Sequence, residues 1–528
     1  MNSKHSQVQP VFYWAVGILT LVIISGVLLP DNLEAVTGTV QGFISNTFGW
    51  YYLIAVTLFA IVCLFLIVSP YGKIKLGKED DKPEYGYLSW FAMLFSAGMG
   101  IGLVFFGVAE PMSHFAIHSP TVDEGTVEAA RESMRFVFFH YGLHAWGIYA
   151  MIAICLAYFN FRKGKSGLIS GTLSPIMNTD GVTGKVIDTF ALVATVTGIV
   201  TSLGFGAVQM NGGISYLTDL PINFWVQAII IVIVTALFLT STTTGLNKGI
   251  RLLSNFNMIL ALILLVFIAT FGAALYSLNL FTNTLGTYIQ TLPELSFRIA
   301  PGSPERREWI NDWTIFYWAW WIAWSPYVGT FIARVSRGRT LREFTIAVLL
   351  VPSLVGFIWF SFVGGAGISL ESQGIMTISS LAEEEMLFGI LSTMPISTIT
   401  SILAIILIAV FFITSADSAT FVLSMHSTNG SLNPPNGIKF VWGIVLSVTA
   451  IVLLYSGGLQ GLQNVMIIAA FPFSIIMLLM VYSLLRSLRY EQIRRTAQQK
   501  KEMKELRQFK KKREKEDKLA KKQRKKNQ

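Results

Sequence analysis

YWAWWIAWSP, residues 317–326, packs four tryptophans into seven residues of a segment that carries no charged side chain. A quaternary ammonium ion cannot donate a hydrogen bond, so a protein binds it selectively by surrounding it with aromatic faces, and tryptophan is the strongest of these partners. Tryptophans of membrane proteins also form interfacial belts or fill a core. Four of them so close together, followed by Ser-Pro, favour a binding site for an organic cation.

The composition of the 528 residues is that of a membrane protein. Hydrophobic residues make up 53% of the chain and charged residues only 13%, which excludes a soluble globular domain. The first span lacks a small-residue cleavage site and is read as a retained helix, and the two cysteines lie within spans, so no disulfide framework is expected. We therefore predict an all-α polytopic membrane protein. Because about 20 apolar residues cross a bilayer, twelve transmembrane helices are expected at 11–29, 51–69, 88–110, 136–159, 186–213, 223–241, 253–277, 310–335, 344–368, 396–425, 438–456 and 464–485.

The loops between the spans predict the orientation, since Lys and Arg stay on the cytoplasmic side of a membrane. The alternate loops are acidic or mixed, as at 383–385. Both termini are therefore expected in the cytoplasm, as an even number of spans requires. Basic residues follow the even-numbered spans, for example Lys73, Arg162, Lys248 and Arg334.

The segment from Arg486 to Gln528 is a strongly basic tail. It holds 19 Lys and Arg residues against 6 Asp and Glu residues, a net charge of +13, whereas the whole chain carries +10 and the remainder therefore about −3. A basic segment directly after a last span is typical of contact with anionic lipids, each Lys or Arg contributing on the order of 1 kcal/mol. A solvated anchor is the alternative, and nucleic acid is not expected as a partner. The absence of Pro and Gly predicts that the tail is at least partly helical.

Two spans carry residues that break helices. SAGMGIG, residues 96–102, places glycines at alternate positions, and Pro326 lacks an N–H and frees the carbonyl of Ile322. Breaks at membrane depth are tolerated only where the backbone is buried in protein or lines a cavity. Paired interruptions in two halves of a chain indicate the site of a secondary transporter. A helix-packing stripe is the alternative reading of Gly98-xxx-Gly102.

FFITSADS, residues 411–418, is the third unusual stretch. Its hydroxyls and carbonyls are hard oxygen ligands of the kind that an alkali cation accepts. Thr and Ser in membrane helices also bond back to the preceding turn, which is the alternative. Asp417 is an ionisable group within a span and so indicates a functional role, or else a structural partner for a basic group near the inner end of the bundle.

Four motifs extend over most of the chain: FSAGMGIG at 95–102 with Glu110-Pro111 behind it, WAWWIAWSP at 318–326, RVSRGR at 334–339 and TSADS at 414–418. With these motifs the chain resembles the betaine/carnitine/choline transporter family, and most closely its bacterial glycine betaine transporters. The resemblance implies LeuT-like inverted five-helix repeats, spans three to seven and eight to twelve, preceded by two extra helices. The corresponding domains would be 1–87 (N-terminus and two peripheral helices), 88–277 (first repeat), 278–309 (an outer or interfacial connection), 310–485 (second repeat) and 486–528 (tail).

The resemblance also implies the substrate-binding residues. Where members of the family commonly have Trp after the histidine that opens the fourth span, this chain has Tyr141, a weaker cation–π partner that brings a hydroxyl. Unwound backbone N–H groups at the glycines would bind a substrate carboxylate. The aromatic box would draw on Trp146, Tyr149 and Trp321, the inward path on Trp320 and Trp324, and the carboxylate subsite on Gly98, Gly100 and Gly102.

Sodium coupling is implied as well, with no other cofactor. The second sodium site of the family uses two threonines one turn apart in the fifth span, and here only Thr195 is present because Ile199 occupies the other position. The stoichiometry therefore stays open. The first site would use the carbonyl oxygens of Ser96, Met99 and Phe411 and the hydroxyls of Thr414 and Ser415.

These features predict a sodium-coupled symporter, not an enzyme, that imports glycine betaine or a related zwitterion for osmoprotection across a bacterial cell membrane by alternating access. The uncharged Gly102 favours a zwitterion, since a site for choline would gain from an Asp; a choline or carnitine transporter is the alternative. The resemblance further implies a homotrimer and a tail that senses osmotic stress.

Three other classes of protein compete with a transporter. A membrane enzyme acting on choline-like head groups would need a metal or an acid–base set. His140 and His144 have the spacing of two metal ligands on one helix face, but no third ligand or Glu base accompanies them in the sequence. A packed or polar-network role is therefore favoured for both. An ion channel would need a symmetric polar filter. An osmosensor that no longer transports would have no evident use for a sodium site.

Overall fold

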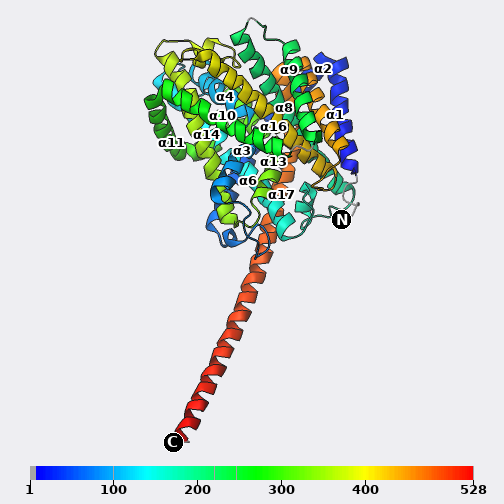
Figure 1. The fold of residues 1–528 in the computed structure, drawn as a ribbon, viewed down its shortest axis with the longest axis vertical. Helices are drawn as coiled ribbons and strands as arrows, with labels where there is room; N and C mark the ends of the chain where they lie inside the picture. The colour runs from blue at the N-terminus through cyan, green and yellow to red at the C-terminus, as the bar shows by residue number, and fades with distance from the viewer. Residues whose placement is uncertain (1–7, 99, 219, 245–246, 527–528) are drawn as a thin grey trace.

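The computed structural model describes residues 8–98, 100–218, 220–244 and 247–526. The chain forms a bundle of helices from which one long helix projects (Figure 1). Among the described residues the only β pairing is a single bridge between Lys75 and Thr340. The predicted all-α class is confirmed.

Helices lie at all twelve predicted spans. Nine described helices are long and apolar enough to cross a membrane, or ten if the bent pair α3 and α4 counts as one. The helices at the predicted spans are α1 (Pro10–Leu28), α2 (Pro30–Val68), α3 (Tyr87–Gly98), α4 (Ile101–Met112), α5 (Val127–Tyr141), α6 (Leu143–Ala157), α8 (Val182–Leu217), α9 (Phe224–Thr244), α10 (Asn247–Phe271), α13 (Phe316–Val335), α14 (Leu341–Ser372), α16 (Ser397–Ser427) and α17 (Asn436–Lys526).

α17 contains the last two predicted spans together with the described part of the tail. Its backbone is non-helical at Gly457 and Gly458, which divides the first of these spans from the second. Beyond the bundle it continues as the projecting helix in Figure 1, so the prediction of a helical tail is confirmed as far as Lys526.

The break predicted in the third span is present. α3 and α4 meet at an angle of 67°, and the alternating glycines lie at this bend. Because glycine is a poor helix former, the run ends one helix and begins another. Met99, within the break, lies outside the described residues.

The break predicted in the eighth span is wrong. α13 runs without interruption through Pro326. The hydroxyl of Ser325 donates a hydrogen bond of 2.7 Å to the carbonyl of Ile322, the acceptor that proline leaves without its backbone donor. A side chain therefore satisfies the freed carbonyl, and the helix continues.

A helix also occupies the predicted connection at 278–309. α11 (Ala274–Ser296) packs against α5 and α14 and buries Leu280, Tyr288 and Leu295 along one side. Polar residues interrupt its apolar pattern, so it lacks the hydropathy of a spanning helix and was not predicted as one.

α13 lies at the centre of the bundle, packed against α6, α8 and α17. Every residue from Phe316 to Thr330 is buried. The tryptophans of this helix therefore do not form an interfacial belt, which would place them at the membrane surface. They lie in the interior of the protein.

The arginines of the RVSRGR motif, residues 334–339, attach the loop after α13 to the start of α3. Arg339 is buried and lies 4.4 Å from the ring centres of both Tyr87 and Trp90. Arg337 donates to Asp81 over 3.0 Å. This guanidinium and the backbone N–H of Lys78 hold the pKa of the Asp81 carboxyl below its usual value. The motif therefore has a structural role in these contacts.

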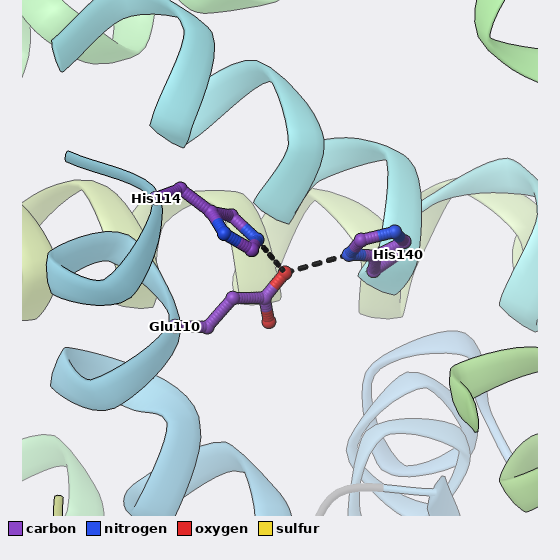
Figure 2. A group of neighbouring side chains, drawn as sticks. All are labelled: Glu110, His114 and His140. Atoms are coloured by element: carbon purple, nitrogen blue, oxygen red, sulfur yellow. Dashed lines mark hydrogen bonds and ion pairs between the residues drawn. The ribbon is translucent and has the colours of Figure 1, made fainter. Parts of the chain in front are cut away.

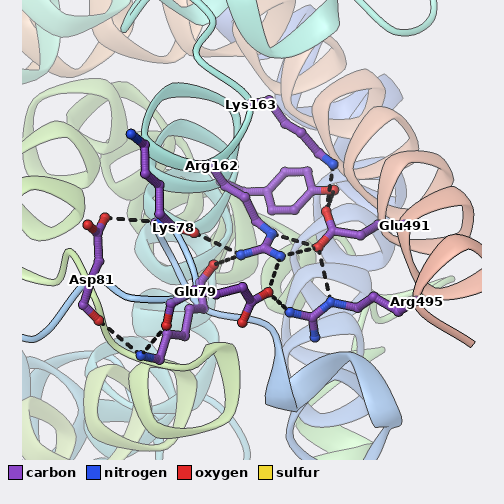
Figure 3. Close-up of polar contacts among 10 residues, drawn as sticks. Lys78, Glu79, Asp81, Arg162, Lys163, Glu491 and Arg495 are labelled. Atoms are coloured by element: carbon purple, nitrogen blue, oxygen red, sulfur yellow. Dashed lines mark hydrogen bonds and ion pairs between the residues drawn. The ribbon is translucent and has the colours of Figure 1, made fainter. Parts of the chain in front are cut away.

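An ion-pair cluster holds the base of the tail where it leaves the bundle. Figure 3 shows Glu491 of α17 between Arg162 and Lys163, at 2.5 Å from each in the closest pairs. Arg162 also pairs with Glu79 over 2.7 Å, and Arg495 contacts the same carboxylate. The cluster joins three separate parts of the chain and fixes the direction in which the tail projects.

Candidate functional site

Two adjoining cavities lie between the bend of the third span and α13. The larger one adjoins Trp320 and Trp324, and the smaller one adjoins Trp146 and Tyr149. They share Gly98, Tyr141 and Trp321 as lining residues. The structure thus brings together all nine predicted substrate-binding residues. The larger cavity adds Gly100, Gly102, Leu103, Ser202, Trp320 and Trp324, and the smaller one adds Ala145, Trp146 and Tyr149.

Aromatic rings surround Trp321 on several sides. Trp320 stacks on it with ring centres 5.3 Å apart and an interplanar angle of 6°. The rings of Tyr141 and Tyr149 meet it edge-on at 5.3 and 6.0 Å, and Trp146 meets Tyr149 at 5.5 Å. Rings at right angles present faces toward a common space, which is the geometry that holds a cation by its attraction to π-electrons.

Each glycine of the bend faces a different indole ring. A side chain at Gly98 or Gly102 would overlap a buried indole, so glycine is required there for close packing of the rings on the backbone, whereas at Gly100 a Cβ atom would make an ordinary contact. A Cβ atom would lie 2.4 Å from Cη2 of Trp146 at Gly98, 3.4 Å from Cη2 of Trp324 at Gly100 and 2.7 Å from Cη2 of Trp320 at Gly102.

The indole N–H groups of the cavity are held by backbone carbonyls. Trp320 and Trp324 both donate to the carbonyl of Gly198, over 3.3 and 2.8 Å, and Trp321 donates to the carbonyl of His140 over 2.9 Å. These bonds fix the planes of the three indole rings. Gly198 was not predicted, because nothing in its local sequence marks it.

A buried polar network lies beside the larger cavity. Glu110 accepts from the hydroxyl of Tyr317 over 2.5 Å and lies 2.7 Å from Nδ1 of His140. The hydroxyl of Tyr141 lies 3.4 Å from that of Tyr317 and donates to the carbonyl of Gly102 over 3.3 Å. A chain of hydrogen bonds therefore leads from Glu110 to the bend.

His140 and His144 both have hydrogen-bonding partners, in keeping with the packed or polar-network role that the sequence favours, but Glu110 accompanies His140, which the sequence does not predict. Figure 2 shows Glu110, His114 and His140 pointing toward one another, all fully buried. His144 instead lies 3.1 Å from the hydroxyl of Ser296. Glu110 also accepts from Tyr317, and Nε2 of His140 lies 3.0 Å from the hydroxyl of Thr314. We therefore read Glu110 and His140 as a hydrogen-bonded pair, with His114 beside it at 3.4 Å.

The candidate sodium ligands of α16 lie beside the bend. A Cβ atom on Gly100 would lie 3.7 Å from Oγ of Ser415. The hydroxyl of Thr414 donates to the carbonyl of Val410 over 2.8 Å and lies 3.2 Å from the carbonyl of Phe411. It thus makes a hydrogen bond to the preceding turn of its own helix, and its oxygen keeps lone pairs for a cation. α16 is unbroken here, and Ser96 bonds through its hydroxyl to Ser254 over 3.2 Å.

Thr195, the candidate for a second sodium site, and Asp417, the ionisable group of the tenth span, have backbone or hydroxyl partners. Thr195 is buried and donates to the carbonyl of Ala191 over 2.7 Å. Asp417 is buried and accepts from the hydroxyl of Thr242 on α9, while its second oxygen has no hydrogen-bond partner among the described residues. Asp417 therefore joins α16 to α9 through a hydroxyl and forms no direct ion pair with a described basic residue.

Comparisons with known proteins agree over nearly the whole chain. The family described as BCCT, betaine/carnitine/choline family transporter, matches residues 10–493. A glycine betaine transporter, OpuD, of Bacillus subtilis (strain 168) is 57% identical over 93% of this chain and 96% of its own length. A probable glycine betaine transporter of Desulfitobacterium hafniense (strain Y51) is 45% identical over 91% of this chain and 97% of its own. An ectoine/hydroxyectoine transporter of Virgibacillus pantothenticus is 42% identical over 92% of this chain and 97% of its own length.

Proposed function

Because this chain belongs to the betaine/carnitine/choline transporter family, we propose that it imports glycine betaine in symport with sodium. It is a multi-pass membrane transport protein and not an enzyme. The observation that carries the substrate is the pair of aromatic cavities against the bend of α3 and α4. The rings suit a trimethylammonium group, and the backbone N–H groups of the bend suit a carboxylate without adding a fixed charge.

Sodium would couple to substrate through the bend itself. The hydroxyls of Thr414 and Ser415 lie on α16, and Gly100 lies on the backbone that faces both Ser415 and Trp324. An ion bound between α16 and the bend would hold α4 in the position that closes the aromatic cavity. Transport is then driven by sodium entry, to which the membrane potential adds about 2.3 kcal/mol per charge for each 100 mV.

Uptake of labelled glycine betaine into proteoliposomes tests the proposal, with an inward sodium gradient or with potassium in its place. Accumulation only with sodium would support a symporter. Binding without accumulation would contradict transport and favour a sensor. If neither binding nor uptake occurred, the assignment of the aromatic cavity would be wrong.

Thr414→Ala is expected to raise the sodium concentration for half-maximal uptake by about tenfold, because one oxygen ligand contributes on the order of 1.4 kcal/mol. The matched control is Thr420→Ala, since Thr420 makes the same back-bond on the same helix, to Ala416 over 2.7 Å, but lies further along it. Sodium titrations of both variants give the measurement. Equal sodium dependence of the two would remove Thr414 from the site.

The tail is proposed to contact anionic lipids and to regulate transport, with both termini in the cytoplasm and the protein a homotrimer. Its described side chains beyond the ion-pair cluster are nearly all exposed, and so free to meet a lipid surface. A chain ending at Gln499 keeps Glu491 and Arg495 in place. We expect it to transport in neutral liposomes and to lose the dependence on anionic lipid that the full chain shows. An unchanged lipid dependence would assign the effect to another surface.

A second class of substrate has support from a relative. One protein that is 42% identical to this chain is named for ectoine and hydroxyectoine. These are cyclic zwitterions whose cationic group carries N–H bonds, and both cavities offer oxygen atoms as well as aromatic faces. We include such zwitterions in the proposed range.

A further inference from the structure

Tyr141 differs from the other cavity aromatics because its polar atom lies next to the bend. The ring lines both cavities and is 3% exposed. Its hydroxyl lies 3.3 Å from the carbonyl oxygen of Gly102, which lines the larger cavity, and 3.4 Å from the hydroxyl of Tyr317. The role of this oxygen depends on where the protons of the network lie.

Three polar side chains surround the carboxyl group of Glu110, and Tyr317 donates to it. Tyr317 lies 2.5 Å from one carboxylate oxygen, and Nδ1 of His140 lies 2.7 Å from the other. Nε2 of His114 is 3.4 Å from that second oxygen. A carboxyl oxygen buried without a hydrogen bond would be costly, and the hydroxyl of Tyr317 supplies that bond to Glu110. The single proton of Tyr317 is therefore directed at Glu110.

The proton of Tyr141 is fixed in turn. The hydroxyl of Tyr317 donates its single proton to Glu110. Toward Tyr141 the oxygen of Tyr317 can therefore only accept a hydrogen bond. The carbonyl of Gly102 is also an acceptor. Whichever of the two receives the proton of Tyr141, that proton is taken up by a protein acceptor, and the phenol oxygen keeps a lone pair for a ligand.

We propose that Tyr141 is a specificity-determining residue that accepts a hydrogen bond from the cationic nitrogen of substrates bearing an N–H. This site would then take zwitterions with a tertiary ammonium or amidinium group in addition to glycine betaine. The inference rests on the proposed function. Tryptophan at this position could not act in this way, because an indole N–H only donates.

Glycine betaine and N,N-dimethylglycine form a matched pair of probes, since they differ only by one methyl group in place of one N–H. Inhibition of labelled glycine betaine uptake by each compound gives two inhibition constants. Tyr141→Phe removes the acceptor and keeps the ring. We expect the constant for dimethylglycine to rise tenfold to a hundredfold, the range for a hydrogen bond to a charged group, and that for glycine betaine to rise by less than about threefold.

Two further variants sharpen the test. Tyr141→Trp should also weaken dimethylglycine selectively, while its stronger cation–π face retains glycine betaine. Tyr317→Phe leaves the carbonyl of Gly102 as the acceptor of the Tyr141 proton, so the ratio of the two inhibition constants should stay close to that of the wild type. The control is Tyr52→Phe, because Tyr52 is a fully buried phenol outside both cavities with its hydroxyl 3.5 Å from a backbone carbonyl. In this control the ratio of the two inhibition constants should equal that of the wild type.

An equal rise of both constants in Tyr141→Phe would overturn the inference, since the hydroxyl would then serve the carboxylate that both probes share. An unchanged pair of constants would overturn it as well. If a variant does not transport, the same two constants are obtained by tryptophan fluorescence titration of the purified protein. Absence of sodium-driven glycine betaine uptake by the wild type would instead contradict the proposed function.

Discussion

Replacement of Trp321 by leucine is expected to abolish uptake of glycine betaine while leaving membrane insertion intact. Trp321 lines both cavities, stacks on Trp320 and meets two tyrosine rings edge-on. A desolvated cation–π contact contributes about 2 kcal/mol or more, which corresponds to at least about thirtyfold in affinity. The loss should be larger than this, because the neighbouring rings also lose the surface against which they pack.

Uptake and binding of labelled glycine betaine by the purified variant give the measurement. Trp225→Leu is the matched control. It is the same substitution at a residue of α9 that is 71% exposed and lies outside both cavities. The control should transport like the wild type and insert equally well. Uptake at the wild-type level by Trp321→Leu would rule out the aromatic cavity as the substrate site.

The sequence indicates which residues meet around the two aromatic cavities, because these residues belong to unusual local patterns. Alternating glycines and clustered tryptophans are rare in spanning helices, and each pattern has a direct physical reading. The bend between α3 and α4 follows from the same glycines. The continuity of α13 through Pro326 does not follow, because it depends on the rotamer of Ser325.

Contacts between distant segments account for what the sequence does not predict. The carbonyl of Gly198 holds two indoles that lie more than a hundred residues further along the chain, yet the surrounding segment reads as an ordinary apolar span. The pairing of Glu110 with His140 likewise joins α4 to α5. A motif identifies Glu110 as notable, but only the packing of the helices supplies its partner.

Gly98→Ala is expected to reduce uptake by at least about tenfold. The added methyl carbon would lie 2.4 Å from Cη2 and 3.0 Å from Cζ3 of Trp146, and that indole is only 2% exposed. Overpacking of this kind costs about 1–3 kcal/mol. Alanine also favours the helical state by about 1 kcal/mol over glycine, so it would oppose the bend that places α4 against the tryptophans of α13.

Gly86→Ala separates these effects from a general loss of helix-end flexibility. Gly86 directly precedes α3, and a Cβ atom there would meet nothing within 4 Å. Uptake of glycine betaine by Gly86→Ala should therefore match that of the wild type. Thermal unfolding of both purified variants shows whether the fold is retained. If Gly98→Ala folded and transported like the wild type, Trp146 would have to yield by more than an ångström without loss of binding, and a rigid aromatic cavity could not be the basis of substrate recognition.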